Sequence, residues 1–194
     1  MFVPTKIATS EIDVKKSRFI AIAIPFNDIN NLKDEVMKLK EQYPDAKHYL
    51  YAYHLNQLMK GNDDGEPGHI ARGFLNLIKQ HNLNLILVVV VRYFGGIKLG
   101  ASNLTRTYLA VVNDLLKKVE KGKLEEVYQY HLTVDYPTFS KLKNAGYFIE
   151  NVQYFVKIEL DIISKRDISE ELKKFSLLKI KQTKVKRITD EHGS

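Results

Sequence analysis

A glycine-rich turn over residues 94–100 carries the side chains of this chain that are best suited to bind an anion. The turn separates the apolar run "LNLILVVVV" from a segment that reads as a helix. Unpaired backbone N–H groups at such a turn attract phosphate and other anions. Basic side chains before, within and after the turn add positive charge. The predicted anion-binding residues are Arg92, Gly95, Gly96, Lys98 and Arg106.

The turn has nearly the spacing of a nucleotide-binding P-loop. Four residues separate Gly95 from Gly100, and Ser102 stands at the position of the final hydroxyl. Ala101 replaces the lysine that contacts the β- and γ-phosphates, so the sequence does not predict nucleotide hydrolysis. No G-x-G-x-x-G follows a predicted strand, and a dinucleotide cofactor has no support.

The acidic stretch "DDGEP" is the second group of residues with possible chemistry. Three carboxylates within four positions suit a divalent cation or general-base catalysis, although Asp-Gly followed by Pro is also a common turn. Arg92 has two interpretations that the sequence leaves open: a cation of the anion site, or the ion-pair partner of one of these carboxylates. The predicted second wall of the site is formed by Asp63, Asp64, Glu66 and His69.

The absence of cysteine excludes disulfides, iron–sulfur clusters, thiolate zinc sites and cysteine nucleophiles. The chain also lacks the H-E-x-x-H zinc motif and the G-x-S-x-G nucleophile motif. The sequence therefore predicts no catalytic residue, no metal ligand and no cofactor, and it favours a binding protein over an enzyme.

The formal net charge of +7 is concentrated in the first part of the chain. Residues 1–123 contain 18 Lys+Arg against 12 Asp+Glu, a net +6, whereas residues 124–194 contain 12 against 11. Such a balance suits an anionic partner such as RNA or the ribosome. No apolar run reaches the ~20 residues of a membrane helix and no signal peptide is recognisable. We expect a soluble, cytoplasmic protein without membrane contact.

The segments around these motifs predict an α+β fold with two domains, residues 1–122 and 123–194. The first domain is expected to contain mixed sheet and helices. The buried run before the turn is typical of a central strand, and the periodicity of the other segments predicts amphipathic helices and paired strands. The predicted strands are 7–14, 18–26, 48–55 and 83–91; the predicted helices are 28–43, 70–81 and 101–122; and residues 56–69 are predicted to be a polar loop.

The second domain has the pattern βαββαβ, which is the order of a ferredoxin-like fold. Its predicted strands are 125–135, 148–152, 154–163 and 178–188, and its predicted helices are 137–145 and 167–175.

The joint presence of "DDGEP" and "VVVVRYFGGIKLG" resembles the IMPACT/YigZ family. Further matches are "KSRF", "DAKHYLYAY", Arg106 and Tyr108, and the resemblance spans nearly the whole chain. It implies a first domain with the left-handed βαβ topology of ribosomal-protein-like domains of the translation machinery. It also implies a ferredoxin-like second domain of the kind found in bacterial members.

The resemblance implies a regulator or binding module linked to translation or the stress response. Eukaryotic IMPACT proteins regulate translation, and nucleic-acid or ribosome binding is suggested for the bacterial type from its fold. We therefore expect RNA, the ribosome or a protein of the translation machinery as partner. Two alternatives stay open: a small-molecule or metal-dependent enzyme that uses the "DDGEP" carboxylates opposite the glycine turn, and an adaptor that binds only proteins.

Overall fold

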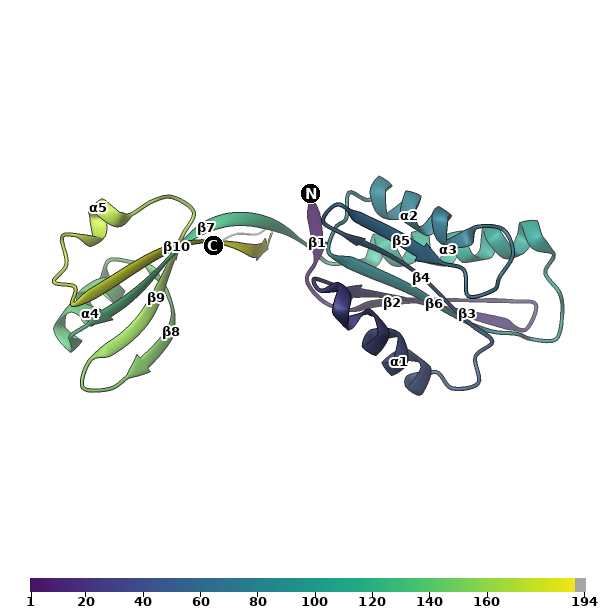
Figure 1. The fold of residues 1–194 in the computed structure, drawn as a ribbon, viewed down its shortest axis with the longest axis horizontal. Coiled ribbons are helices and arrows are strands. Elements are labelled where there is room, and N and C mark those ends of the chain that lie inside the picture. Colours follow the sequence, from purple (N-terminus) through teal and green to yellow (C-terminus); the bar gives the residue numbers. More distant parts are fainter. Residues whose placement is uncertain (191–194) are drawn as a thin grey trace. The chain divides into compact units, whose positions relative to one another are not determined.

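The computed structural model describes residues 1–190, with side chains through Val185. The chain is a mixed α/β protein, as predicted, and forms two compact units, Met1–Lys123 and Leu124–Thr189 (Figure 1).

The main sheet of the first unit has the strand order β2-β3-β6-β4-β5, and neighbouring strands are antiparallel. The run of valines forms the middle strand and is buried on both faces, which confirms the prediction of a central strand. The strands are β2 (Ala8–Val14), β3 (Ser17–Pro25), β4 (His48–Leu55), β5 (Leu58–Asn62) and β6 (Ile86–Tyr93).

The two faces of this sheet bury two separate cores. Alternate residues of β3 divide between them: Phe19, Ala21 and Ala23 face one core, whereas Ile20, Ile22 and Ile24 face the other. Helices α2 (Ile70–Gln80) and α3 (Ala101–Lys118) cover the first face, and α1 (Leu32–Gln42) covers the second (Figure 1). The turn and the "DDGEP" loop both lead directly into the helices of the first face.

Strands β3 and β4 flank β6, so the chain between them crosses over the central strand. This connection contains α1 and, before it, the short helix η1 (Ile29–Asn31). The Asp28 side chain accepts a hydrogen bond from the Asn30 amide and caps η1. The left-handed sense that the family resemblance implies for such a crossover stays a prediction.

Three boundaries differ from the predicted ones because partners distant in the sequence determine them. Residues 58–62 form the edge strand β5 inside the predicted polar loop. Helix α3 ends at Lys118 rather than at Gly122, because β7 (Lys121–Val134) begins there. The first residues of β7 pair with β1 (Phe2–Pro4), a strand that the sequence did not predict.

The second unit has the predicted order βαββαβ, and its strands lie in the order β10-β7-β9-β8. Its helices and one face of its sheet share a core that includes Tyr130, Leu132 and Leu160. The elements after β7 are α4 (Tyr136–Asn144), β8 (Phe148–Tyr154), β9 (Ile158–Ser164), α5 (Ser169–Leu172) and β10 (Lys179–Asp190). Strand β9 begins later than predicted and α5 is shorter. Among the described residues, no helix is long and apolar enough to cross a bilayer.

Candidate anion-binding site

Arg92 lies near the end of the central strand, on the face covered by α2 and α3. In the sheet register it is opposite Phe19 of β3 and also opposite His48 of β4. Only 7% of its surface is exposed. A guanidinium in such a position is costly unless an opposite charge and hydrogen bonds accompany it.

Glu66 of the "DDGEP" loop supplies that charge. Its Oε1 accepts a hydrogen bond from Nη1 of Arg92 in a buried ion pair, and a second one from the Tyr108 hydroxyl of α3 at 2.9 Å. Nε2 of His48 lies 3.5 Å from the same oxygen. We call Glu66, Arg92 and Tyr108 the clasp, because they join a loop, the central strand and a helix.

The Tyr108 hydroxyl is held in its neutral, hydrogen-bond-donating form. Burial, together with the negative charge of Glu66, raises the pKa of Tyr108. The ring packs edge-on against Phe19 at 4.9 Å between centroids. Arg92 in turn lies over the rings of Phe19 and Phe94, at 5.5 and 5.6 Å from their centroids. The clasp is therefore surrounded by aromatic packing.

These contacts favour the ion-pair interpretation of Arg92. Its guanidinium is paired with a carboxylate through Nη1 and is shielded from solvent, while Nε is buried without a hydrogen-bond partner among the described residues. The two motifs that characterise the sequence do meet in space, but they meet as a structural contact. Arg92 and Glu66 contact one another directly rather than across an open pocket.

The other two carboxylates of the predicted second wall also bind protein groups. Asp63 accepts a hydrogen bond from the Ala71 amide at 2.6 Å, in the first turn of α2. Asp64 accepts one from the Tyr49 amide of β4 at 2.7 Å, and its carbonyl contacts Nδ1 of His48 at 2.9 Å. Among the side chains that the structure describes, no group of three or more His, Asp or Glu residues is arranged to hold a metal ion.

His69, the remaining residue of that wall, is exposed and precedes α2. Its backbone is left-handed, with φ of 52°, at the N-cap position, and its side chain does not cap the helix.

The two glycines of the turn have different roles. A side chain at Gly95 would overlap the backbone of Lys16 in the β2–β3 turn, and the Gly95 amide donates to Ser17 Oγ at 3.1 Å. That amide is therefore occupied. Gly96 has a φ of +83° with open space beside it, so its backbone stays accessible.

Lys98 and Arg106 are the exposed cations of the predicted site. In the described part of the chain, no ion pair includes either of them. Arg106 lines a shallow groove of about 550 Å³ on α3. The groove residues are Ala101, Ser102, Thr105, Arg106 and Leu109. Of the predicted anion site, Gly96, Lys98 and Arg106 thus remain at the surface.

The surface of the α2–α3 layer has an uneven charge distribution. Helix α2 contains no acidic residue, and the one acidic residue of α3, Asp114, is bound by Lys118 at 2.6 Å and by the Ser10 hydroxyl. We call the exposed cations of this layer and of the turn before α3 that form no ion pair in the described part of the chain the basic face. They are Arg72, Lys79, Lys98, Arg106 and Lys117.

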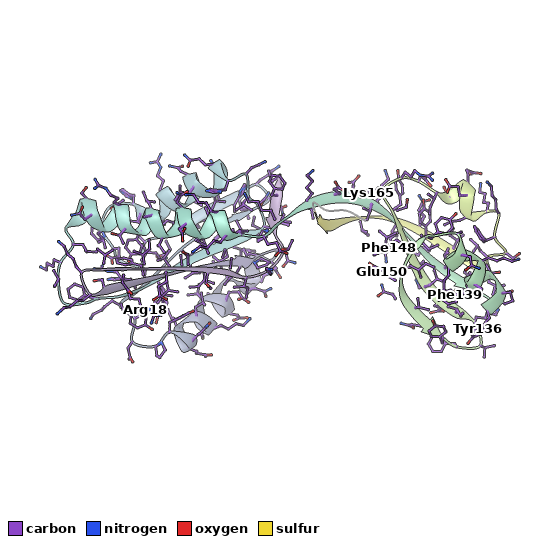
Figure 2. The ribbon with its side chains drawn as sticks, turned by 180° about the vertical axis from the view of Figure 1, so that it is seen from behind. Arg18, Tyr136, Phe139, Phe148, Glu150 and Lys165 are labelled. Carbon is purple, nitrogen blue, oxygen red and sulfur yellow. The ribbon has the colours of Figure 1, made fainter. Side chains whose placement is uncertain are left out.

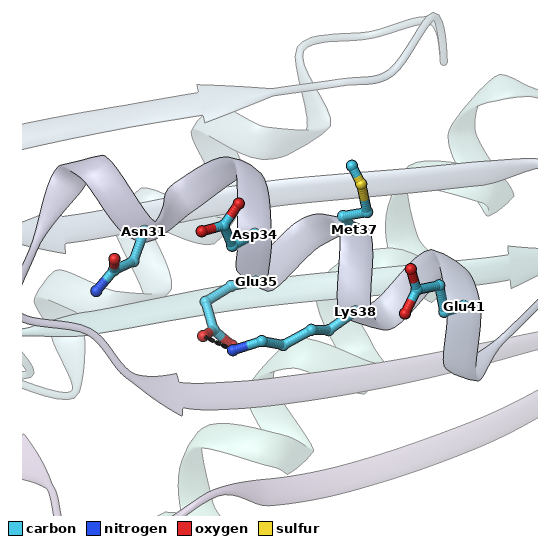
Figure 3. Close-up of a pocket in the computed structure, with 6 residues that line it drawn as sticks. All are labelled: Asn31, Asp34, Glu35, Met37, Lys38 and Glu41. Carbon is cyan, nitrogen blue, oxygen red and sulfur yellow. Dashed lines mark hydrogen bonds and ion pairs between the residues drawn. The ribbon is translucent and has the colours of Figure 1, made fainter.

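Helix α1, on the opposite side of the sheet, has a different character. Its outer surface carries a hollow of about 390 Å³, where Glu35 and Lys38 form an ion pair of 2.7 Å (Figure 3). Three carboxylates line it with a single lysine, so this hollow does not suit an anion. The lining residues are Asn31, Asp34, Glu35, Met37, Lys38 and Glu41.

Tyr108 of the clasp and His48 beside it were not predicted as site residues. Tyr108 lies on the apolar stripe of α3 and stood out only as a family match. His48 lies within the family match "DAKHYLYAY" and had no other distinguishing feature. Its proximity to Glu66 depends on the pairing of β4 with β6, which no local pattern reveals.

Comparison with known proteins identifies the family. Residues 15–116, just over half of the chain, match the Impact N-terminal domain. The chain is 31% identical to the IMPACT family member YvyE of Bacillus subtilis, over 78% of this chain and 73% of that protein. It is 30% identical to the IMPACT family member YigZ of Escherichia coli, over 69% of each.

One solved structure has the same fold over almost the whole length. It is a crystal structure of a hypothetical protein with a TM-score of 0.64 and 25% identity, and the match covers 92% of this chain and 95% of that one. The matched family segment contains the clasp and both motifs. The chain belongs to the IMPACT family.

Proposed function

We propose that this protein is a non-enzymatic binding module of the translation or stress-response machinery, and that it contacts RNA phosphates, free or on the ribosome, through its basic face. The observation that carries the proposal is the separation of charge in the first unit. The layer of α2 and α3 exposes several cations that are unpaired among the described residues and has one carboxylate, Asp114, which Lys118 neutralises, whereas α1 carries equal numbers of acidic and basic residues. Clustered cations on one face are the electrostatic footprint of a nucleic-acid-binding protein.

The backbone near Lys98 supports this proposal. Gly96 and Gly100 both have positive φ with open space beside them, and α3 begins at Ala101 without a side-chain cap. An approaching phosphate therefore meets accessible amides as well as positive charge. The link with translation rests on the family resemblance.

The occupied carboxylates count against the enzymatic alternative. Asp63, Asp64 and Glu66 each accept a hydrogen bond from a protein donor. General-base or metal chemistry at this loop would first require these contacts to break.

The experiment compares RNA binding of two charge-matched variants. Fluorescence anisotropy of a labelled rU12 oligomer is measured between 50 and 200 mM KCl for the wild type, for Lys98→Gln/Arg106→Gln, and for Lys33→Gln/Lys40→Gln on α1. We expect wild-type affinity to fall steeply with salt, because bound counterions are released. The first variant should bind more weakly, with its log–log salt slope reduced by about 0.7 for each lost contact.

The α1 variant has lost the same charge and should retain the wild-type slope. Equal weakening in both variants would show that net charge, and not the basic face, determines RNA binding, and it would overturn the proposed contact. Unchanged binding in the Lys98/Arg106 variant would overturn it as well.

A further inference from the structure

The second unit exposes aromatic side chains where β8 turns into β9. Phe155 is 62% exposed, Tyr154 is 62% exposed and Tyr136, at the start of α4, is 51% exposed. We call these three residues the aromatic tip. Figure 2 shows Tyr136 and Phe139 together at this end of the unit, while Phe148 lies at the other end of β8. Burial normally stabilises rings of this size, so exposed ones indicate an interaction site.

The backbone of the tip is fixed although its rings are exposed. The Tyr136 hydroxyl donates to the carbonyl of Phe155 at 3.0 Å, and the Phe155 amide donates to the carbonyl of Lys157 at 2.9 Å. The Tyr154 ring packs at right angles to Phe139, with 6.0 Å between centroids. Among the described residues, no ring contact involves Phe155. A ring held on a rigid turn binds with little loss of conformational entropy.

Two lysines and one carboxylate lie beside the tip. Lys157 follows the turn directly and is exposed, and Lys143 lies over the Phe139 ring at 5.6 Å from its centroid. The carboxylate next to Tyr136, Asp135, caps α4 by accepting from the Thr138 amide at 2.8 Å. Exposed rings next to cations suit a polyanion that also carries flat groups able to stack on the rings.

We propose that the aromatic tip stacks on unpaired bases of single-stranded RNA, with Lys143 and Lys157 contacting the adjoining phosphates. This inference rests on the proposed function and adds to it a second contact that requires bases as well as phosphates. Stacking on an aromatic side chain tolerates any base sequence, because every base has a π-face. The second unit thereby selects single strands over duplexes, whose bases are already stacked.

The chain contains no tryptophan, so a single introduced one reports stacking without background. The reporter is Phe155→Trp, and the matched control is Phe148→Trp, whose position is also 62% exposed. Each full-length variant is titrated with rU12 and with a 12-mer of the same phosphate number made of abasic residues. We expect rU12 to quench the emission of Phe155→Trp, the abasic 12-mer to leave it unchanged, and Phe148→Trp to respond to neither.

Affinities separate this inference from the proposed function. In the same salt, Phe155→Ala should bind rU12 about fivefold or more weakly than the wild type does, and Phe148→Ala should bind like the wild type. Salt-dependent binding of equal strength to rU12 and to the abasic 12-mer would overturn stacking and leave the proposed function standing. No binding of either oligomer would overturn both.

Discussion

Glu66 and Arg92 form a buried ion pair that joins the "DDGEP" loop to the end of the central strand, across 26 positions of the chain. Both side chains are buried, so each charge relies on the other for its neutralisation. The pair is the contact through which the two most recognisable motifs of the sequence stabilise one another.

Replacing Glu66 by Gln should therefore destabilise the first unit strongly. The loss expected for a broken buried pair is about 3–5 kcal/mol, because Arg92 stays buried without a counter-charge. Urea unfolding followed by circular dichroism measures it. Glu11→Gln is the control, since Glu11 pairs with Arg18 at the surface and its loss should be much smaller. Equal losses in the two variants would show that the clasp does not stabilise the fold.

Replacing Tyr108 by Phe should remove a hydrogen bond to a charged acceptor without changing the packing. The expected loss in the free energy of unfolding is about 1.5–3 kcal/mol at neutral pH. Burial and the negative charge of Glu66 raise the pKa of Tyr108 in the folded protein. The hydroxyl therefore contributes fully to the free energy of unfolding below the unfolded pKa of about 10. This contribution is lost as the pH rises toward the folded pKa. Above pH 10 the difference between the wild type and Tyr108→Phe should shrink, and a constant difference would contradict this assignment.

Gly95→Ala should be more damaging than Gly96→Ala. A methyl group at Gly95 would overlap the Lys16 backbone, and the loss should reach at least the upper end of the overpacking range, about 3 kcal/mol. Gly96 has open space but a positive φ, so alanine there costs about 1–2 kcal/mol of backbone strain. Thermal unfolding of the two variants compares them, and the reverse order would show that the β2–β3 turn does not pack as described.

In the second unit, Asp161→Asn should reduce stability at neutral pH more than at acid pH. Burial alone would raise the pKa of Asp161, but hydrogen bonds from Asn151, His131 and Gln129 outweigh it and lower the pKa. The stabilisation is thus present above the unfolded pKa of about 4 and is lost as the pH falls through the folded value. Amide hydrogen exchange of β9 at pH 7 and pH 3 tests this, and an equal effect at both values would contradict it.

The sequence predicted the elements whose stability is local or strongly patterned. The valines of β6 are typical of a buried strand, and the stripe of α3 contains enough apolar residues to identify a helix. Strand β5 was predicted wrongly as loop, because an edge strand with Gly61 and Asn62 depends on the hydrogen bonds of its neighbour β4 rather than on its own side chains.

The candidate site was predicted as a set of residues but not as an arrangement. Residue types alone indicated that Arg92 needed a carboxylate and that the "DDGEP" loop contained several. The carboxylate that pairs with Arg92 is determined by the path of the loop, in which Asp64 and His69 have left-handed backbone. It is also determined by the register that places His48 beside Arg92. These are long-range properties, so the sequence left the choice between a ligand site and an ion pair open.

The position of β6 in the sheet constrains how the chain is made. It is the middle strand, yet it leaves the exit tunnel after β2, β3, β4 and β5. The emerging chain therefore holds two hairpins, β2–β3 and β4–β5, whose inner edges stay unpaired until Ile86–Tyr93 is synthesised and inserts between them. A chain interrupted before Ile86 would expose both edges to other strands, and its aggregation would be the consequence of strand order alone.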